Sequence, residues 1–245
     1  VNAKLLTKPE NQLCLTCHDS KNADFSKKHG NISLDKTECI SCHNPHTGDT
    51  KSLFQVSVHE PLNMGDCQVC HNQLSKPDSK LCYTCHSDQE KKFKQAHMHH
   101  PVEKGDCLSC HSPHASRNKP LLNGDNLTLC LTCHKDISGQ LKMKTVHAPA
   151  RSGDCQKCHA SHSSPNEKLL TTSGSDLCYT CHTNTKEEIS KKKSPHPPAQ
   201  EGQCLLCHTA HASDTDKLVK SGGQDLCISC HADVVKEKTN KSVHS

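Results

Sequence analysis

The chain has 245 residues and a formal net charge of +4, and 31% of its residues are hydrophobic but only 2% are aromatic. Leucine, isoleucine, valine and phenylalanine make up about 17% of it, below the roughly 20% under which a chain seldom forms a packed apolar core. The small basic excess and the few aromatic residues argue against nucleic-acid binding, and no stretch approaches the roughly eighteen apolar residues that span a bilayer. The polypeptide by itself would therefore be classed as disordered.

All twenty cysteines lie in ten copies of the motif C-x-x-C-H. Two thiols three residues apart lie on one side of a helical turn, where they can add to the two vinyl groups of one porphyrin. The histidine that follows then lies under the iron as its proximal ligand. In chain order the copies are Cys14/Cys17/His18, Cys39/Cys42/His43, Cys67/Cys70/His71, Cys82/Cys85/His86, Cys107/Cys110/His111, Cys130/Cys133/His134, Cys155/Cys158/His159, Cys178/Cys181/His182, Cys204/Cys207/His208 and Cys227/Cys230/His231. We predict ten covalently attached haem c cofactors.

Zinc sites and redox disulfides are the alternative explanations of C-x-x-C. Histidine is 22 of the 245 residues, and neither alternative explains its place after the second cysteine of every copy. With one haem for roughly every 25 residues, the porphyrins supply the apolar interior that the chain lacks. We predict a mostly irregular fold with short α-helices, built from repeats around a core of stacked haems, and an apo chain that does not fold.

The N-terminal segment, residues 1–60, carries two haem motifs of different kinds. The Leu-Cys kind begins at Leu13, and the second kind, at Cys39, follows a short polar side chain that is usually Asp after Gly. We expect this polar side chain to cap the motif's helix. The positions concerned are Glu38, Asp66, Asp106, Asp154 and Gln203. After His46 the chain reaches His59 without a Leu-Cys motif, as if half a repeat had been removed.

Residues 61–96 form an irregular two-haem segment, and residues 97–245 hold three regular repeats with six haems. From Cys82 onward the Leu-Cys motifs recur after 48, 48 and 49 residues, which indicates repeat architecture. The Cys67 motif departs from the pattern, because Leu74 stands where other repeats carry a second histidine. No stretch between the segments looks like a flexible linker, so we predict one continuous body.

Twelve histidines remain after the ten proximal ones, and ten of them recur at positions suited to distal ligands. They are the H-x-x-H residues His46, His114, His162 and His211, the residues eight before a motif cysteine, His59, His99, His147 and His196, and finally His29 and His244. His97 and His100 are left over, and either can replace His99 or serve the position lost at Leu74. A single such histidine would be read as a solvated surface residue, but ten at repeat positions favour haem ligation. The three methionines, which are rival ligands, share no repeat position.

The chain resembles the multihaem c-type cytochromes with doubled C-x-x-C-H domains. The resemblance rests on His147-Ala148-Pro149, Gly153-Asp154-Cys155, Cys158-His159-Ala160-Ser161-His162, Leu169-Leu170 and Leu177-Cys178-Tyr179-Thr180-Cys181-His182. It implies bis-histidine haems in alternating parallel and T-shaped pairs that relay electrons in an exported bacterial or archaeal protein. Members include periplasmic shuttles, conduit subunits and extracellular filaments.

Electron transfer is favoured over catalysis, because a haem enzyme needs an open iron site and the histidines here can close every one. Tyr83 and Tyr179 occupy equivalent places inside motifs, which indicates packing. We predict a protein that is not an enzyme, and a multihaem reductase with one open haem is the less favoured alternative.

Covalent haem attachment implies an exported protein whose leader was removed before Val1, and we favour an extracellular location over a periplasmic one. The expected partners are redox proteins or extracellular electron acceptors, with no nucleic acid and no membrane span. Each lysine-rich segment ends in a histidine that precedes another motif, but only Ser245 follows His244. We therefore hypothesise that the haem chain continues into a neighbouring copy, as a filament. A periplasmic carrier or conduit subunit, in which His244 folds back on its own chain, is the alternative.

Overall fold

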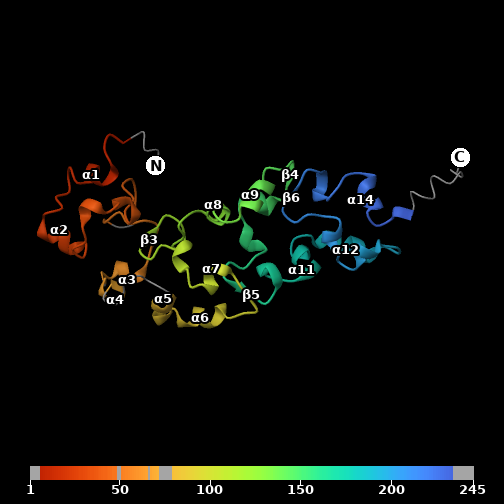
Figure 1. Cartoon of the computed structure of the whole chain (residues 1–245), viewed down its shortest axis with the longest axis horizontal. Helices are drawn as coiled ribbons and strands as arrows, with labels where there is room; N and C mark the ends of the chain where they lie inside the picture. Colours follow the sequence, from red (N-terminus) through yellow and green to blue (C-terminus); the bar gives the residue numbers. More distant parts are fainter. Residues whose placement is uncertain (1–5, 49–50, 66, 72–78, 234–245) are drawn as a thin grey trace. The chain divides into compact units, whose positions relative to one another are not determined.

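The computed structural model describes residues 6–48, 51–65, 67–71 and 79–233. They are mostly irregular, with many short helices and two-residue strands (Figure 1). This confirms the predicted fold class of short helices and long irregular connections. Leu74 and His244 lie outside the described residues.

The helices are short throughout. The α-helices are α1 (Glu10–Cys14), α2 (Ala23–Lys28), α3 (Glu60–Asn63), α4 (Gln68–His71), α5 (Ser79–Cys85), α6 (Ser87–Phe93), α7 (His100–Glu103), α8 (Asn126–Leu131), α9 (Lys135–Gln140), α10 (Ala148–Ser152), α11 (Gly174–Tyr179), α12 (Thr183–Lys191), α13 (Pro197–Gln200) and α14 (Gln224–Ile228). The 3₁₀ helices are η2 (Leu34–Lys36), η3 (Cys39–Ser41), η4 (Cys107–Ser109), η5 (Cys155–Lys157), η6 (Glu167–Leu169), η7 (Cys204–Leu206) and η8 (Asp216–Leu218).

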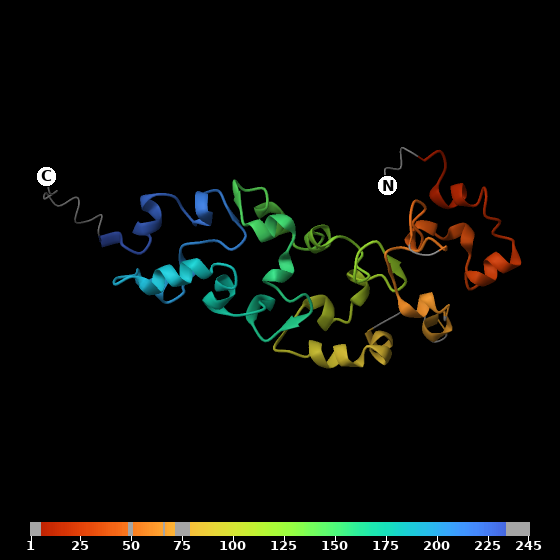
Figure 2. The ribbon, with the colours of Figure 1, turned by 180° about the vertical axis from the view of Figure 1, so that it is seen from behind.

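Three two-stranded antiparallel sheets join segments that are far apart in the sequence (Figures 1 and 2). The strands are β1 (Ser57–Val58), β2 (His97–Met98), β3 (Ala115–Ser116), β4 (Thr145–Val146), β5 (Ser163–Ser164) and β6 (Ala212–Ser213). They pair as β1 with β3, β2 with β5 and β4 with β6. Each pair therefore holds two neighbouring repeats together.

The chain divides into two compact units. The first comprises Val1–Lys91 and His100–Asp125 and contains the β1–β3 pair. The second comprises Lys92–His99 and Asn126–Ser245 and contains the other two pairs. The division into segments 1–60, 61–96 and 97–245 stays a prediction.

Local sequence explains why the helices after β1 and β4 are so short. His59 and His147 are the N-cap residues of α3 and α10, and each helix has proline in its first turn, where a fixed φ is compatible with helix initiation. Gly153 ends α10 at φ +78°, a left-handed conformation that favours glycine. Strand, histidine, proline and glycine thus follow one another within a few residues, and the histidine is held at the junction of strand and helix.

The described residues contain very little apolar core. Leu34, Ala115 and Ala212 are the apolar side chains buried among them. The remaining buried side chains are polar, and the most buried, Ser164, has only 2% of its surface exposed. Since burial of apolar surface is the main driving force of folding, the polypeptide described here lacks the core that would stabilise it alone.

The predicted caps are wrong at the described positions. Glu38, Asp106, Asp154 and Gln203 precede 3₁₀ helices, and none of their side chains makes a capping hydrogen bond. Asp106 follows Gly105 at φ +70° and has φ −86° and ψ +66°, which is outside the extended conformation that an N-cap side chain requires. Asp154 instead forms an ion pair with Lys157 at 2.8 Å, and its contacts with Lys157 and Ser152 lower the pKa of Asp154. Asp66 lies outside the described residues.

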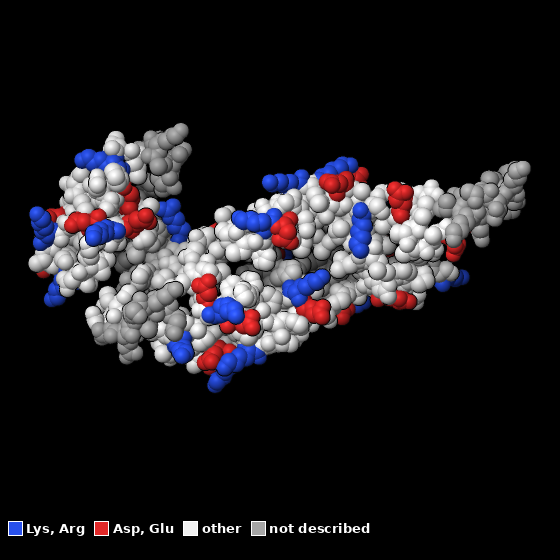
Figure 3. Space-filling view, in the orientation of Figure 1, with Lys and Arg blue, Asp and Glu red and all other residues white. Residues whose placement is uncertain are grey.

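The charged side chains form no single-sign patch on the face shown in Figure 3, where lysine and arginine are interspersed with aspartate and glutamate. Within the described ranges, no helix is long and apolar enough to cross a membrane.

Candidate haem-ligand sites

Each C-x-x-C-H motif forms one helical turn. In all ten, the histidine N–H donates to the carbonyl of the first cysteine, at 2.9 to 3.1 Å. The turn places the two thiols and the imidazole of a motif on the same segment of helix, as one porphyrin requires. The Leu-Cys motifs lie on or at the end of α-helices, whereas the Cys39, Cys107, Cys155 and Cys204 motifs start 3₁₀ helices.

The twenty cysteines are free thiols, and the second cysteine of a motif differs in exposure between the two kinds of motif. In the Leu-Cys motifs it is exposed, at Cys17, Cys85, Cys133, Cys181 and Cys230. In the other motifs it is half-buried, at Cys42, Cys70, Cys110, Cys158 and Cys207. The first cysteine is half-buried in every motif except that of Cys227, where it is exposed. No cysteine is fully buried, so each thiol can be reached by a porphyrin vinyl group, and the attachment of haem at all twenty stays a prediction.

A hydroxyl explains the recurring Thr or Ser in the Leu-Cys motifs. In each of them this side chain donates to the carbonyl of the leucine three residues earlier, at 2.6 to 2.7 Å. The residues are Thr16, Thr84, Thr132, Thr180 and Ser229. The bond is local and tightens the turn that carries the two thiols.

A strained loop orients the proximal histidine of the other motifs. His43, His111, His159 and His208 each have Nδ1 within 2.7 to 3.0 Å of a carbonyl nine residues later. The residue after that carbonyl is a leucine at φ between +51° and +59° in every case. An L-residue with a side chain rarely adopts this conformation, so the loop stores strain to direct the carbonyl at Nδ1. Since Nδ1 makes this bond, Nε2 is the nitrogen that can ligate a metal.

The strand pairs bring two predicted distal histidines together. In each strand pair, a histidine directly follows the first strand, and its backbone N–H donates to the carbonyl of an H-x-x-H histidine at 2.8 Å. The Nδ1 of the same histidine lies 2.8 to 3.0 Å from the carbonyl of the residue before the H-x-x-H histidine. The pairs are His59 with His114, His99 with His162 and His147 with His211. We call each arrangement a histidine clamp. Here too Nδ1 makes the bond to a carbonyl, so Nε2 is the nitrogen that can ligate a metal.

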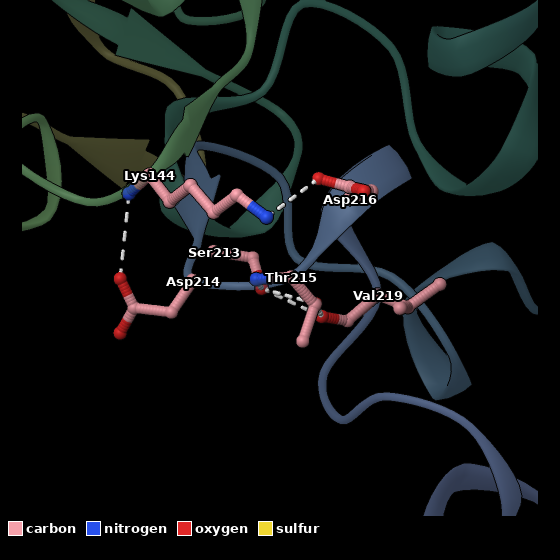
Figure 4. Close-up of polar contacts among 6 residues, drawn as sticks. All are labelled: Lys144, Ser213, Asp214, Thr215, Asp216 and Val219. Carbon is pink, nitrogen blue, oxygen red and sulfur yellow. Dashed lines mark hydrogen bonds and ion pairs between the residues drawn. The ribbon is translucent and has the colours of Figure 1, made fainter.

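The third clamp shows the polar contacts that fix its strands (Figure 4). The Lys144 backbone N–H donates to Asp214 at 3.3 Å, and its Nζ lies 3.2 Å from Asp216. The buried Ser213 hydroxyl donates to the Val219 carbonyl at 2.6 Å. Both charged partners of the Lys144–Asp216 pair are largely exposed, so the buried serine bond contributes more to the geometry than the ion pair.

Seven predicted distal rings lie close to seven proximal rings. Their ring centres are 5.9 to 6.1 Å apart. The pairs are His29–His43, His59–His86, His71–His114, His99–His134, His147–His182, His159–His211 and His196–His231. Two imidazole nitrogens at about 2 Å on opposite sides of one metal ion would place the ring centres about 6 Å apart. The residues therefore fit an iron between each pair.

Burial favours the neutral, ligating form of two H-x-x-H histidines. It lowers the pKa of His114 and of His211 below the usual histidine value, and the neighbouring proximal and clamp histidines lower it further. A neutral imidazole has the free nitrogen lone pair that a metal requires.

Thiols of consecutive motifs also lie side by side. The Cys14 and Cys39 sulfurs and a Glu10 oxygen are within 4.8 Å of one another. Burial, together with these two neighbours, raises the pKa of the Cys39 thiol to about 11. Burial and the adjacent Cys204 thiol likewise raise the pKa of Cys178.

On the other side, the Cys158 thiol has a pKa raised by burial and by Cys181. The first cysteine of the Cys178–Cys181 motif thus lies beside Cys204 of the following motif, and its second cysteine is near enough to Cys158 of the preceding motif to act on that thiol electrostatically. Because C-x-x-C-H motifs typically bond both cysteines to one porphyrin, we do not interpret these clusters as metal sites.

The remaining candidates lie apart from these pairs. Within the described ranges, His46 is exposed and makes no ring contact with another histidine, and neither His18 nor His208 has a second histidine ring against it. His97 lies in β2, and His100 opens α7 with Nδ1 3.8 Å from Glu103. Of the three neighbouring histidines, His99 is the one placed against a proximal ring, that of His134, at 6.0 Å.

Two kinds of supporting residue were missed in the sequence. The first is the buried serine two residues after the H-x-x-H histidine of each clamp, Ser116, Ser164 or Ser213, whose hydroxyl donates to a carbonyl of the strained loop. The recurring His-x-Ser pattern was a signal that could have found it. The second is the left-handed leucine of that loop, for which leucine itself gives no signal.

Ten helical turns with paired thiols, histidine nitrogens held by carbonyls, and paired rings at a metal-spanning distance define a multihaem c-type cytochrome, an electron-transfer protein. The doubled CXXCH motif family matches residues 1–23, 99–139, 147–187 and 196–236. These matches cover more than half of the sequence, and the chain belongs to this family. No curated protein matches the chain.

Proposed function

We propose that this cytochrome relays single electrons over long distances through ten haems, each held between two histidines, outside the cell. The observation that carries the proposal is the set of seven proximal–distal ring pairs at 5.9 to 6.1 Å. The haem supplies one-electron exchange between ferric and ferrous iron. The chain's own histidines would hold each iron from both sides and would leave no position for a substrate.

The ring pairs follow two ligation rules. A histidine that directly precedes a short helix serves the Leu-Cys motif of the same repeat, as His147 serves His182. An H-x-x-H histidine serves the proximal histidine of the other kind of motif in the preceding repeat, as His211 serves His159. By the first rule His99, and neither His97 nor His100, is the ligand for His134.

The order of the relay is proposed to follow the sequence. The first cysteine of the Cys178–Cys181 motif lies beside Cys204 of the following motif, and Cys181 acts electrostatically on Cys158 of the preceding motif. Cys14 and Cys39 repeat the contact between first cysteines. Porphyrins attached at such neighbouring thiols would be near enough for direct electron exchange.

An exported location agrees with the covalent attachment of haem c that these motifs indicate. We place the protein outside the cell, in the transfer of electrons to extracellular acceptors or redox proteins. A periplasmic carrier or a subunit of a membrane conduit is the alternative, supported by the same ligand geometry. Localisation of the native protein by protease accessibility on intact cells decides between them.

One observation favours a head-to-tail homopolymer. His208 has its Nδ1 fixed by the Lys217 carbonyl at 2.9 Å but no second histidine ring among the described residues. The second rule gives it an H-x-x-H ligand, as His211 is for His159. His46 is such a ligand and is exposed. A neighbouring copy would supply it.

Spectroscopy of the ferric protein tests the relay. We expect pyridine haemochrome to give about ten haems per chain and EPR to give low-spin iron throughout. A high-spin fraction in the assembled protein would overturn full bis-histidine ligation and support a reductase. Electron microscopy tests the polymer separately. We expect filaments that the His46→Ala variant shortens, and discrete particles at every concentration would overturn the polymer alone.

A further inference from the structure

We propose that the haem at His43 is closed by a local histidine, His29, in place of the long-range ligand of the repeats, and that this gives the site strongly crossed imidazole planes. The inference rests on the proposed bis-histidine function and assigns one of its ligands. In the sequence His29 was only a candidate, without a partner.

A short helix places His29. Asn22 caps α2 by accepting from the Phe25 backbone N–H at 3.0 Å, and His29 follows the helix as its C-cap residue. Its Nδ1 lies 2.8 Å from the Phe25 carbonyl, so Nε2 is free. Gly30 and Asn31 then adopt φ +62° and +58°, and the chain turns away immediately after the histidine.

The two rings of this site fit one iron. The His29 and His43 ring centres are 6.1 Å apart, and both side chains are half-buried. His43 has its own Nδ1 2.7 Å from the Ser52 carbonyl. Each ring also has a phenylalanine against it, Phe25 at 4.5 Å from His29 and Phe54 at 5.1 Å from His43. Both imidazoles are therefore held by a carbonyl and an aromatic ring.

Two departures from the repeat pattern explain why a local ligand is needed and is available. By the second rule the distal ligand of His43 would come from the H-x-x-H position of the Cys67 motif, but that position is Leu74. His29 lies ten residues before Cys39, near the place of the first-rule histidines, which lie eight residues before a motif cysteine, but its repeat has no Leu-Cys motif between His46 and His59 for it to serve. The His43 site, which lacks a long-range ligand, and His29, which lacks a Leu-Cys motif to serve, thus lie in the same repeat.

The local ligand approaches at a different angle. The imidazole planes of His29 and His43 are 56° apart, whereas in the other six pairs the planes are 15° to 40° apart. The mutual angle of the two rings sets how unequally they interact with the iron d orbitals. Crossed rings make these orbitals nearly equivalent and shift the EPR signal to low field, while near-parallel rings give a rhombic signal.

EPR of variants of the full haem-loaded protein tests the assignment. In the parent we expect a low-field, large-g signal from about one haem in ten beside a larger rhombic signal. His29→Ala should abolish the low-field signal and create one high-spin haem. His114→Ala should also create one high-spin haem but keep the low-field signal, and His100→Ala should change neither.

His29→Met is the second variant, in case the alanine variant fails to load haem. It should keep ten low-spin haems and raise the potential of one of them, because thioether ligation stabilises ferrous iron. A low-field signal that survives His29→Ala, or a methionine variant without a raised potential, would overturn the inference. High-spin iron throughout the parent would instead overturn the proposed function, so the two failures are distinguishable.

Discussion

The first pair of motifs, in residues 6–58, and the repeats of residues 97–233 each orient one kind of proximal histidine, such as His43 and His159, by the same bond from Nδ1 to a carbonyl, but they support that bond differently. In the repeats the buried serine of the clamp, such as Ser164, holds the loop whose carbonyl meets the proximal histidine. In the first pair this position is Gly48, where a Cβ would lie 2.7 Å from the Leu53 backbone. Gln55 holds the loop there, donating to the Ile40 carbonyl at 2.7 Å and to the His43 carbonyl at 3.0 Å. The bond from the proximal histidine to a loop carbonyl is therefore the same in both regions, but a different side chain holds the loop in place.

The difference extends to the ligands. His29 and His43 are 14 residues apart, whereas His159 and His211 are 52 apart and belong to different repeats. With the proposed ligation, the histidines of the repeats would also cross-link neighbouring repeats, and those of the first pair would not.

The largest effect is expected from removing the haems. Because Leu34, Ala115 and Ala212 are the apolar side chains buried among the described residues, both regions should unfold when the chain is produced without haem. Far-UV circular dichroism of the apo chain should show disorder. Retained structure in only one region, detected by limited proteolysis, would mean that the other alone depends on haem.

Gly153→Ala should cost about 3 kcal/mol of unfolding free energy, because the new Cβ would lie 2.7 Å from the Leu127 Cβ at φ +78°. Gly65→Ala is the matched control in the irregular segment. Gly65 has φ +74° but no described atom within 4 Å of the new Cβ, so the cost should be about 1 kcal/mol. Denaturant unfolding followed by haem absorbance measures both, and equal losses would contradict the close packing in the repeat.

Ser164→Ala should cost about 1 to 2 kcal/mol, because it removes the bond to the Leu170 carbonyl and leaves the Asn166 N–H without its acceptor. Ser163→Ala is the control in the same strand, since its hydroxyl makes one long contact of 3.4 Å with the Lys92 carbonyl. The same unfolding measurement applies. A larger loss at Ser163 would show that the serine bond does not support the loop.

The smallest effect separates local from long-range ligation. His211→Ala should destabilise the ferric protein by about 1 kcal/mol more than His29→Ala, because the lost cross-link closes a 52-residue loop instead of a 14-residue one. Midpoints of denaturant unfolding for the two variants test this difference. The reverse order would mean that clamp contacts, and not the cross-link, dominate the stability of the repeats.

The sequence by itself determined the cofactor attachment, the repeat and the fold class. A motif such as Cys155/Cys158/His159 makes its own helical turn, and the scarcity of apolar residues predicts short helices and irregular connections. These properties are local or compositional, so they can be read without knowing which segments meet. The caps predicted at Asp106 and Asp154 were wrong because the glycine before each residue redirects the backbone.

Only the tertiary structure decided which histidines face each other. His147 is nearer in sequence to His159 than to His182, yet its ring lies 6.1 Å from that of His182. The choice depends on a strand pair that joins Val146 to Ala212 and on a strained loop that turns a carbonyl toward Nδ1. Two-residue strands and left-handed leucines have no sequence signature, because long-range packing imposes them on residues that would adopt other conformations in isolation.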